Sequence, residues 1–232
     1  YNTALIGKAH FEPWLGSPGD FYENRMAQLG EHGPHRGFDH MELANHFFEG
    51  HSHFDLVMNA HPDLKSRFYP MITERGQNTA STGETGAVQV WPMDVPRDLY
   101  HTDWVADRTL AWLDKQGESP WFCWMSFPDP HHPWDVPRSE LHRVNWRDLD
   151  LPPAYLDGDE ARRVLATKPK HWLGYYEASL WSNLESPRDY VPADMTANQV
   201  REINAMTHIE NELIDEACQR VIDYLKARDL YD

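Results

Sequence analysis

Two short stretches carry residue types that could bind an anion and transfer a proton. In Gly7-Lys8-Ala9-His10, Lys8 and His10 are two residues apart, so extended backbone points both side chains to the same side. In Pro130-His131-His132-Pro133, two adjacent histidines stand between prolines. Lysine supplies a fixed positive charge, and histidine donates or accepts a proton near neutral pH. Taken alone, the first stretch more commonly indicates a surface lysine and a turn histidine.

Each stretch follows a segment that predicts a β-strand. Residues 2–6 predict a short strand, and the apolar and aromatic run at residues 121–127 predicts a strand buried on both faces. Pro128, Pro130 and Pro133 then exclude further regular pairing. In open α/β sheets, ligands bind beyond the carboxyl ends of the strands. We therefore expect both stretches at one such edge.

Helical patterns flank these strands. An apolar stripe predicts a helix over residues 103–115 with Thr102 as its N-cap, and a longer one predicts a helix over 197–228 that begins with a capping box of Thr196 and Gln199. Weaker patterns predict helices at 20–28, 54–66, 159–167 and 171–183, and a turn at 33–39 that leads into a short strand. Helix, short loop and buried strand in succession indicate a βαβ unit. The expected fold class is α/β, a three-layer α/β/α sandwich around a mostly parallel sheet, with long loop-rich excursions.

Composition excludes some partners. The formal net charge of -16 argues against nucleic acid and anionic membranes, and no apolar run approaches the roughly 20 residues that span a bilayer. Cys123 and Cys218 are expected to be two inert buried thiols, with a disulfide as the alternative. No signal peptide is visible, and the chain starts without Met, so cytoplasm and periplasm both stay open as locations.

Histidines gather in one region. Seven of the 14 fall between His32 and His61, and the pair His51-x-His53 could chelate a transition metal. The remaining spacing fits no standard ligand pattern. Turn and surface histidines are therefore the favoured interpretation, and we predict no metal ligands within the chain.

Several motifs together carry a family resemblance. The opening Y-N-T-A-L-I-G-K-A-H-F resembles the G-Y-x-T-x-x-x-G-K-x-H segment of the sulfatase family, within the alkaline-phosphatase-like superfamily, and P-H-H-P-W resembles that family's P-H-x-P-[FW] segment. Gly37-Phe38-Asp39 resembles its G-F-D turn. Thr102-Asp103 before an amphipathic helix, and a final helix that contains Asp215, also match. These landmarks occur in family order over nearly the whole chain.

The resemblance implies an activity and roles for particular residues. A sulfatase cleaves a sulfate monoester, here of a small molecule or a saccharide, with a formylglycine nucleophile and a calcium ion. By the resemblance, Lys8 contacts the sulfate and the formylglycine, His10 bonds the formylglycine hydroxyl, and His131 contacts the ester oxygen and protonates the leaving alcohol. His132 fills the variable position and is expected to form a wall of the substrate pocket.

The resemblance also identifies what residues 1–232 lack. Neither cysteine lies in the C-x-P-S-R motif that yields formylglycine, so this segment and the calcium ligands are expected outside the chain. The chain is then the central portion of a single sulfatase-like catalytic domain, and the isolated chain is expected to be inactive. Homo-oligomer formation stays open.

Two other functions remain as alternatives. One is a phosphonate monoester or phosphodiester hydrolase of the same superfamily; retention of Lys8 and His10 favours sulfate over this one. The other is a non-catalytic binding module that uses the aromatic loops.

Overall fold

A computed structural model of the chain describes residues 1–11, 22–45, 52–64, 67–68, 80–180 and 189–231. The chain divides into two compact units. The first comprises residues 1–68, 94–131 and 210–232, and the second comprises residues 69–93 and 132–209. Among the described residues, no helix combines the length and the apolar character needed to cross a bilayer.

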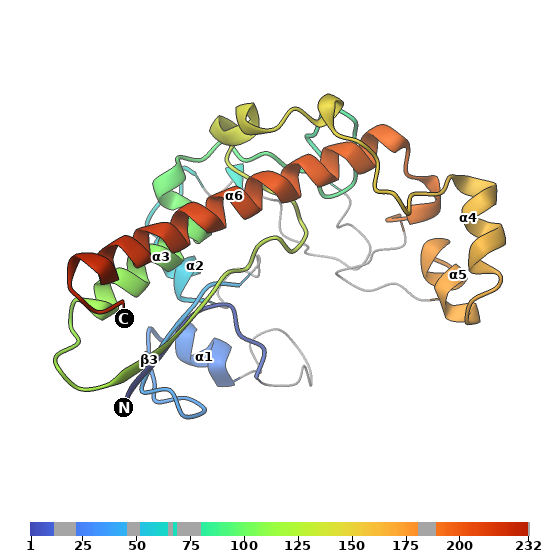
Figure 1. Cartoon of the computed structure of the whole chain (residues 1–232). Helices are drawn as coiled ribbons and strands as arrows, with labels where there is room; N and C mark the ends of the chain where they lie inside the picture. Colours follow the sequence, from blue (N-terminus) through green and yellow to red (C-terminus); the bar gives the residue numbers. More distant parts are fainter. Residues whose placement is uncertain (12–21, 46–51, 65–66, 69–79, 181–188, 232) are drawn as a thin grey trace. The chain divides into compact units, whose positions relative to one another are not determined.

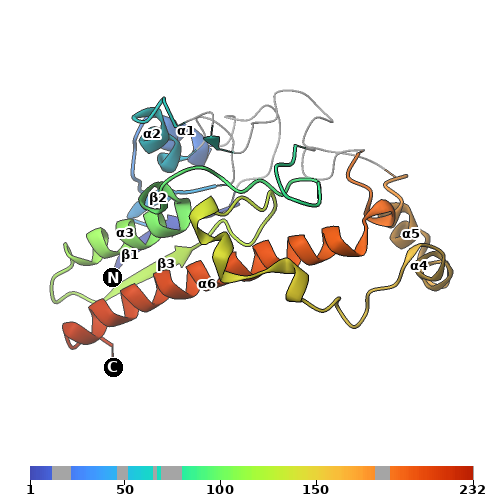
Figure 2. The same cartoon turned by 90° about the horizontal axis from the view of Figure 1, so that it is seen from above.

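Three strands form the sheet of the first unit. They are β1 (Asn2–Gly7), β2 (His40–Leu43) and β3 (Trp121–Ser126), in the order β2-β1-β3 (Figure 1, Figure 2). β1 pairs in parallel with both neighbours, and its Ala4, Leu5 and Ile6 are completely buried in the centre of the sheet. The strands predicted at 2–6 and 121–127, and the short strand after residues 33–39, are therefore confirmed in one parallel sheet.

Side chains that alternate along each strand give this sheet two covered faces. On one face, Leu5 and Met41 pack in one core cluster with Met26 of helix α1 (Tyr22–Gln28). On the other face, Glu42 bonds to Arg108 of helix α3 (His101–Leu113). The described part of this unit is thus an α/β/α arrangement, as expected.

The prediction that the third strand is buried on both faces was wrong. Phe122 and Trp124 are 53% and 45% exposed. β3 is an edge strand of the described sheet, and α1 packs over β1 and β2. The same face of β3 has ring contacts from Phe38 to Phe122 and Trp124, at centroid distances of 6.3 Å, and from Phe11 to Trp124 at 5.8 Å.

Helix α3 begins earlier than predicted. Its N-cap is Tyr100, preceded by the short 3-10 helix η2 (Arg97–Leu99), and Thr102 lies inside the first turn. The Thr102 hydroxyl donates to Asp129 over 2.9 Å instead of capping the helix. The expected N-cap was wrong because the hydroxyl is used in a tertiary contact.

The long helix α6 (Ala197–Ala227) matches its prediction closely. The capping box is present, since the Gln199 N–H donates to Thr196 Oγ1 (3.3 Å) and the Thr196 N–H donates to Gln199 Oε1 (2.8 Å). Its C-terminal part, from Glu210, belongs to the first unit, where Tyr224 donates to Asp114 just beyond α3 over 2.7 Å. Asp215 is exposed, as a solvated carboxylate.

Short helices complete both units. In the first, α2 (His53–Asn59) starts with a capping box of Ser52 and Asp55 and ends well before residue 66. The second unit contains the remaining elements: η3 (Arg138–Arg143), η4 (Trp146–Asp148), α4 (Gly158–Leu165), α5 (Lys170–Tyr176), η5 (Pro192–Asp194) and the start of α6. α5 is shorter than predicted because Ala178 takes a positive φ of 49°; part of the predicted span, residues 181–183, lies outside the described residues.

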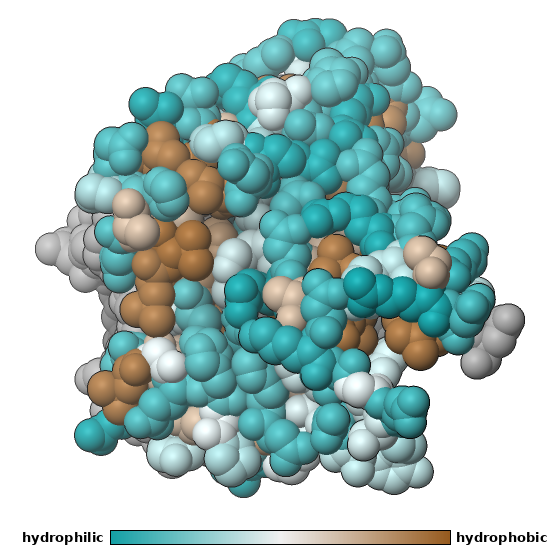
Figure 3. All heavy atoms as spheres, turned by 90° about the vertical axis from the view of Figure 1, so that its left-hand side faces the viewer, coloured by the Kyte–Doolittle hydropathy of each residue, from teal (hydrophilic) through white to brown (hydrophobic). Residues whose placement is uncertain are grey.

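The surface in Figure 3 is mostly hydrophilic with a few apolar areas, in keeping with the acidic composition.

Candidate functional site

The backbone around Gly7 fixes where Lys8 stands. Gly7 ends β1 with φ +111°, and a Cβ at this position would lie 1.6 Å from the carbonyl oxygen of Ser126. Only glycine permits both the conformation and the close approach. The Lys8 N–H then donates to that same Ser126 oxygen over 3.2 Å. Lys8 is therefore held at the carboxyl end of β1, next to the carboxyl end of β3; it is half-buried, and His10 beyond it is exposed.

A buried carboxylate fixes the loop that carries His131. Asp129 is 5% exposed and lies two residues before His131. It accepts hydrogen bonds from Tyr100, from Nε2 of His101 (2.8 Å) and from Thr102 (2.9 Å). Three donors from the start of α3 thus anchor the loop that follows β3. His131 itself is half-buried.

Topology brings three of the four predicted site residues to one edge of the sheet. β1 and β3 are adjacent and parallel, with Gly7 paired to Ser126. Lys8, His10 and His131 follow the carboxyl ends of these two strands within the first unit. A cation and two imidazoles at such an edge suit an oxyanion and its leaving group. Convergence of their side chains on a single point stays a prediction.

His132 belongs to the second unit and has a structural partner there. Its Nδ1 lies 2.7 Å from Oε1 of Gln89, and because the amide oxygen only accepts, Nδ1 carries the proton. Gln89 is fully buried, and its backbone carbonyl oxygen accepts a hydrogen bond from the backbone N–H of Trp134. This bond orients the imidazole; the expected role of His132 as a wall of the substrate pocket stays a prediction.

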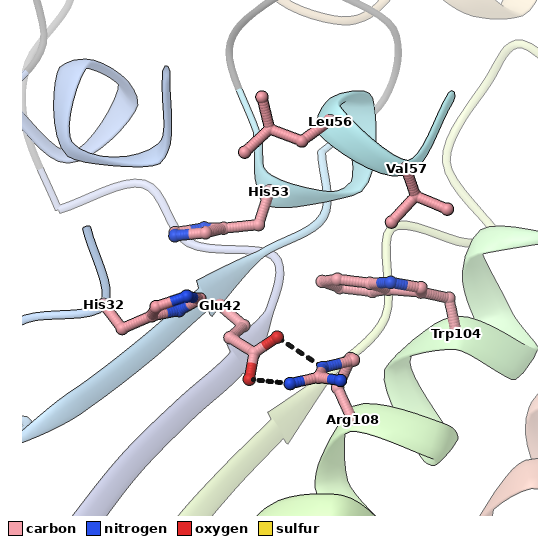
Figure 4. A pocket seen from close by; sticks show the side chains of 7 residues that line it. All are labelled: His32, Glu42, His53, Leu56, Val57, Trp104 and Arg108. Atoms are coloured by element: carbon pink, nitrogen blue, oxygen red, sulfur yellow. Dashed lines mark hydrogen bonds and ion pairs between the residues drawn. The ribbon is translucent and has the colours of Figure 1, made fainter. Parts of the chain in front are cut away.

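A pocket of about 220 Å³ lies elsewhere in the first unit, beside β2, α2 and α3 (Figure 4). Its lining consists of His32, Glu42, His53, Leu56, Val57, Trp104 and Arg108. Figure 4 shows Arg108 paired through two nitrogens with the Glu42 carboxylate; the Nη2–Oε1 distance is 2.9 Å. Glu42 also bonds to His40 over 2.8 Å.

The charges of this pocket follow from burial and pairing. Burial alone would raise the pKa of Glu42, but the hydrogen bonds from His40 and Arg108 outweigh it and lower the pKa to about 2. Burial lowers the pKa of His53 to about 4, so its ring is neutral at neutral pH. Glu42 and Arg108 were not singled out in the sequence. The alternation His40-x-Glu42 on a short strand was the signal that could have indicated Glu42.

The structure corrects the candidate His51-x-His53 chelate. His53 Nδ1 accepts the N–H of Leu43 over 2.9 Å, and Nε2 donates to the carbonyl of Glu31 over 3.0 Å. Both ring nitrogens are thus occupied by backbone, so His53 is not available to an ion. His51 lies outside the described residues.

Both cysteines are free thiols, as expected, but each is half-buried, so the prediction that they are buried was wrong. Burial raises the pKa of Cys123, in β3, to about 12 and also raises that of Cys218. Neither is therefore a thiolate at neutral pH.

Comparisons with known proteins identify the fold of this chain. No protein-family model and no curated protein matches the chain. Two solved structures are similar: phosphonate monoester hydrolases of Agrobacterium radiobacter (TM-score 0.64, 19% identity, 100% of this chain) and of Silicibacter pomeroyi (TM-score 0.61, 20% identity, 98% of this chain). The chain spans 42% of the length of each. These hydrolases belong, with the sulfatases, to the alkaline-phosphatase-like superfamily, so the chain has part of the alkaline-phosphatase-like α/β fold.

Proposed function

We propose that the protein containing this chain is a hydrolase of the alkaline-phosphatase-like superfamily that cleaves sulfate monoesters. The observation that carries the proposal is the Gly7–Ser126 contact. It places Lys8 beside the end of β3, from which the loop to His131 departs. Lys8, His10 and His131 are also the residues that match the sulfatase motifs G-K-x-H and P-H-x-P.

Each of the three residues has a defined task in such a reaction. The Lys8 ammonium would stabilise the negative charge of the sulfate oxygens in the transition state. His131, at the end of the loop anchored by Asp129, would donate a proton to the departing alkoxide or phenoxide. His10, exposed beyond Lys8, would act as the second proton carrier on the nucleophile side.

The cysteines of this chain do not fit the formylglycine precursor that the resemblance implies. Cys123 sits within β3 with a thiol pKa of about 12, and neither cysteine lies in C-x-P-S-R. As the resemblance implies, we assign the formylglycine and the calcium ligands to parts of the protein outside residues 1–232. They would supply nucleophilic attack and further charge stabilisation, while this chain binds the ester and transfers protons.

A phosphonate monoester hydrolase is the second candidate, because both similar solved structures carry that name. Sulfate and phosphonate monoesters present similar anionic tetrahedral groups, and a lysine with histidines can serve either. Retention of Lys8 and His10 favours sulfate.

The test compares substrates on the longest natural protein that contains the chain. Nitrophenyl sulfate, nitrophenyl phenylphosphonate and bis-nitrophenyl phosphate share a leaving group, so differences in kcat/KM report the transferred group. We expect the highest kcat/KM for the sulfate. A preference of more than tenfold for the phosphonate would favour the second candidate, and turnover of none of them above that of a Lys8→Ala control would reject a hydrolase of this class.

A further inference from the structure

The described part of the histidine-rich segment places three metal-ligating side chains together. His32, His40 and Glu42 each offer one ligand atom, and these atoms lie within 4.8 Å of one another. His40 and Glu42 are two residues apart on β2, so they project from the same face of the sheet. Two ligands of a tetrahedral zinc ion lie about 3.3 Å apart, since each bond is about 2.0–2.1 Å long. The cluster is therefore close to the size that one ion requires.

The bonding of His32 prepares one nitrogen for an ion. Its Nδ1 lies 3.2 Å from the carbonyl oxygen of Met41. A carbonyl only accepts, so Nδ1 carries the proton and Nε2 keeps its lone pair. A histidine that binds a metal through one ring nitrogen usually donates the N–H of its other ring nitrogen to a group such as a backbone carbonyl.

Glu42 supplies the negative charge. It is 3% exposed and ionised, and Arg108 Nε bonds to its Oε2. Its Oε1 lies 2.8 Å from Nε2 of His40 and 2.9 Å from Nη2 of Arg108. An ion between Oε1 and Nε2 would therefore replace the bond to Nη2 and release the Nε2 proton, while Arg108 Nε stays on Oε2. The arginine thus orients the carboxylate from outside.

One movement is needed. The rings of His32 and His40 are stacked, with centroids 5.2 Å apart and planes within 7°. Ring lone pairs lie in the ring plane, so parallel rings cannot both aim at a single ion. His32 lies on an exposed loop ahead of β2 and is also stacked on His53, with centroids 4.7 Å apart. Metal binding would therefore require the His32 ring to turn out of both stacks so that Nε2 faces the other two ligands.

We propose that His32, His40 and Glu42 form a binding site for a divalent first-row transition metal, with zinc as its physiological candidate. Two imidazoles and one carboxylate suit Zn²⁺, Co²⁺ or Ni²⁺ and leave one coordination position for water or a small ligand; Ca²⁺ prefers an all-oxygen set. The pocket of about 220 Å³ shares His32 and Glu42 with this cluster. A small ligand in the pocket would therefore lie next to the ion, beside Trp104. The site is separate from the residues assigned to ester hydrolysis.

The experiment measures Zn²⁺ binding to the full chain by competition with a chromophoric chelator. His32→Gln is the main variant because His32 is the exposed member of the three ligands. His40→Gln removes a second ligand, and His208→Gln, at an exposed position on α6, is the matched control. We expect one tight site in the wild type and the control. Each ligand variant should weaken binding by more than about tenfold, the lower limit for losing even an outer-shell partner.

Bound Co²⁺ gives an independent readout, because a four-coordinate site absorbs visible light far more strongly than the hydrated ion. We expect this spectrum in the wild type and its loss in both ligand variants, with Ca²⁺ unable to displace the cobalt. Equal Zn²⁺ affinity of the wild type and His32→Gln, or an equal loss in His208→Gln, would overturn the proposal.

Discussion

The ion pair between Glu42 and Arg108 gives a prediction whose magnitude can be worked from the structure. The Glu42 side chain is 4% exposed and that of Arg108 is 37% exposed. A pKa lowered from 4.5 to about 2 corresponds to about 3 kcal/mol in favour of the ionised carboxylate. His40 contributes part of this free energy, and solvent weakens the contribution of Arg108 because its guanidinium is partly exposed. We therefore expect Arg108→Gln to lower the free energy of unfolding by about 2 kcal/mol at pH 7.

A matched control is the ion pair of Arg147 with Glu84, whose side chains are 56% and 64% exposed. Arg147→Gln should cost less than about 1 kcal/mol, because exposed pairs contribute little. Urea denaturation followed by circular dichroism measures both variants against the wild type. Equal losses in the two variants would show that burial does not strengthen the pair of Glu42 and Arg108.

The pH dependence has a defined sign. The folded pKa of Glu42 lies below its unfolded value, so the stabilisation is complete above pH 4.5 and is lost as the pH falls through about 2. The difference between the wild type and Arg108→Gln should therefore be constant from pH 7 to pH 5 and shrink below pH 4.5. A difference that persists unchanged at pH 2–3 would contradict a charge-based origin.

Three further predictions follow from the site and its surroundings. Gly7→Ala should destabilise the protein by more than about 3 kcal/mol in urea denaturation, since its Cβ would overlap the Ser126 carbonyl. Gly37→Ala has a positive φ but open space, so it should cost only about 1 kcal/mol, and similar losses would show that the contact is unimportant. His131→Ala in the longer protein should slow an alkyl sulfate more than nitrophenyl sulfate, because only the poorer leaving group needs protonation; equal losses in kcat would show that His131 is not the acid. Residues 1–232 alone should not turn over nitrophenyl sulfate and should bind sulfate weakly, with an affinity that salt reduces; robust turnover by a monomer in sedimentation would refute this.

The elements that depend on local pattern could be predicted from the sequence. The capping box of Thr196 and Gln199 marked the start of α6, and the apolar runs marked β1 and β3. Parallel pairing followed from the helix that links the strands. Lys8 and His131 could be placed at one sheet edge because Lys8 directly follows β1 and the short loop to His131 follows β3.

The features that depend on tertiary contacts could not be predicted from the sequence. Thr102 has the sequence signature of an N-cap, but Asp129 is buried and takes its hydroxyl. The apolar run that contains Phe122 and Trp124 suggested a strand buried on both faces. In the described residues, however, α1 covers β1 and β2 on that face and does not reach β3. His32 meets Glu42 only because the chain turns before β2, a geometry that no residue spacing encodes.

The most direct test of the proposed function is the kcat of the longer protein on nitrophenyl sulfate after Lys8→Ala. Removal of one preorganised charge from the transition state should lower kcat by about 10²–10³-fold. Lys115→Ala, at an exposed position just after α3, should leave kcat within about twofold of the wild type and is the matched control. A kcat for Lys8→Ala equal to that of Lys115→Ala would contradict the assignment of Lys8 to the reacting anion, and with it the active site proposed at this edge of the sheet.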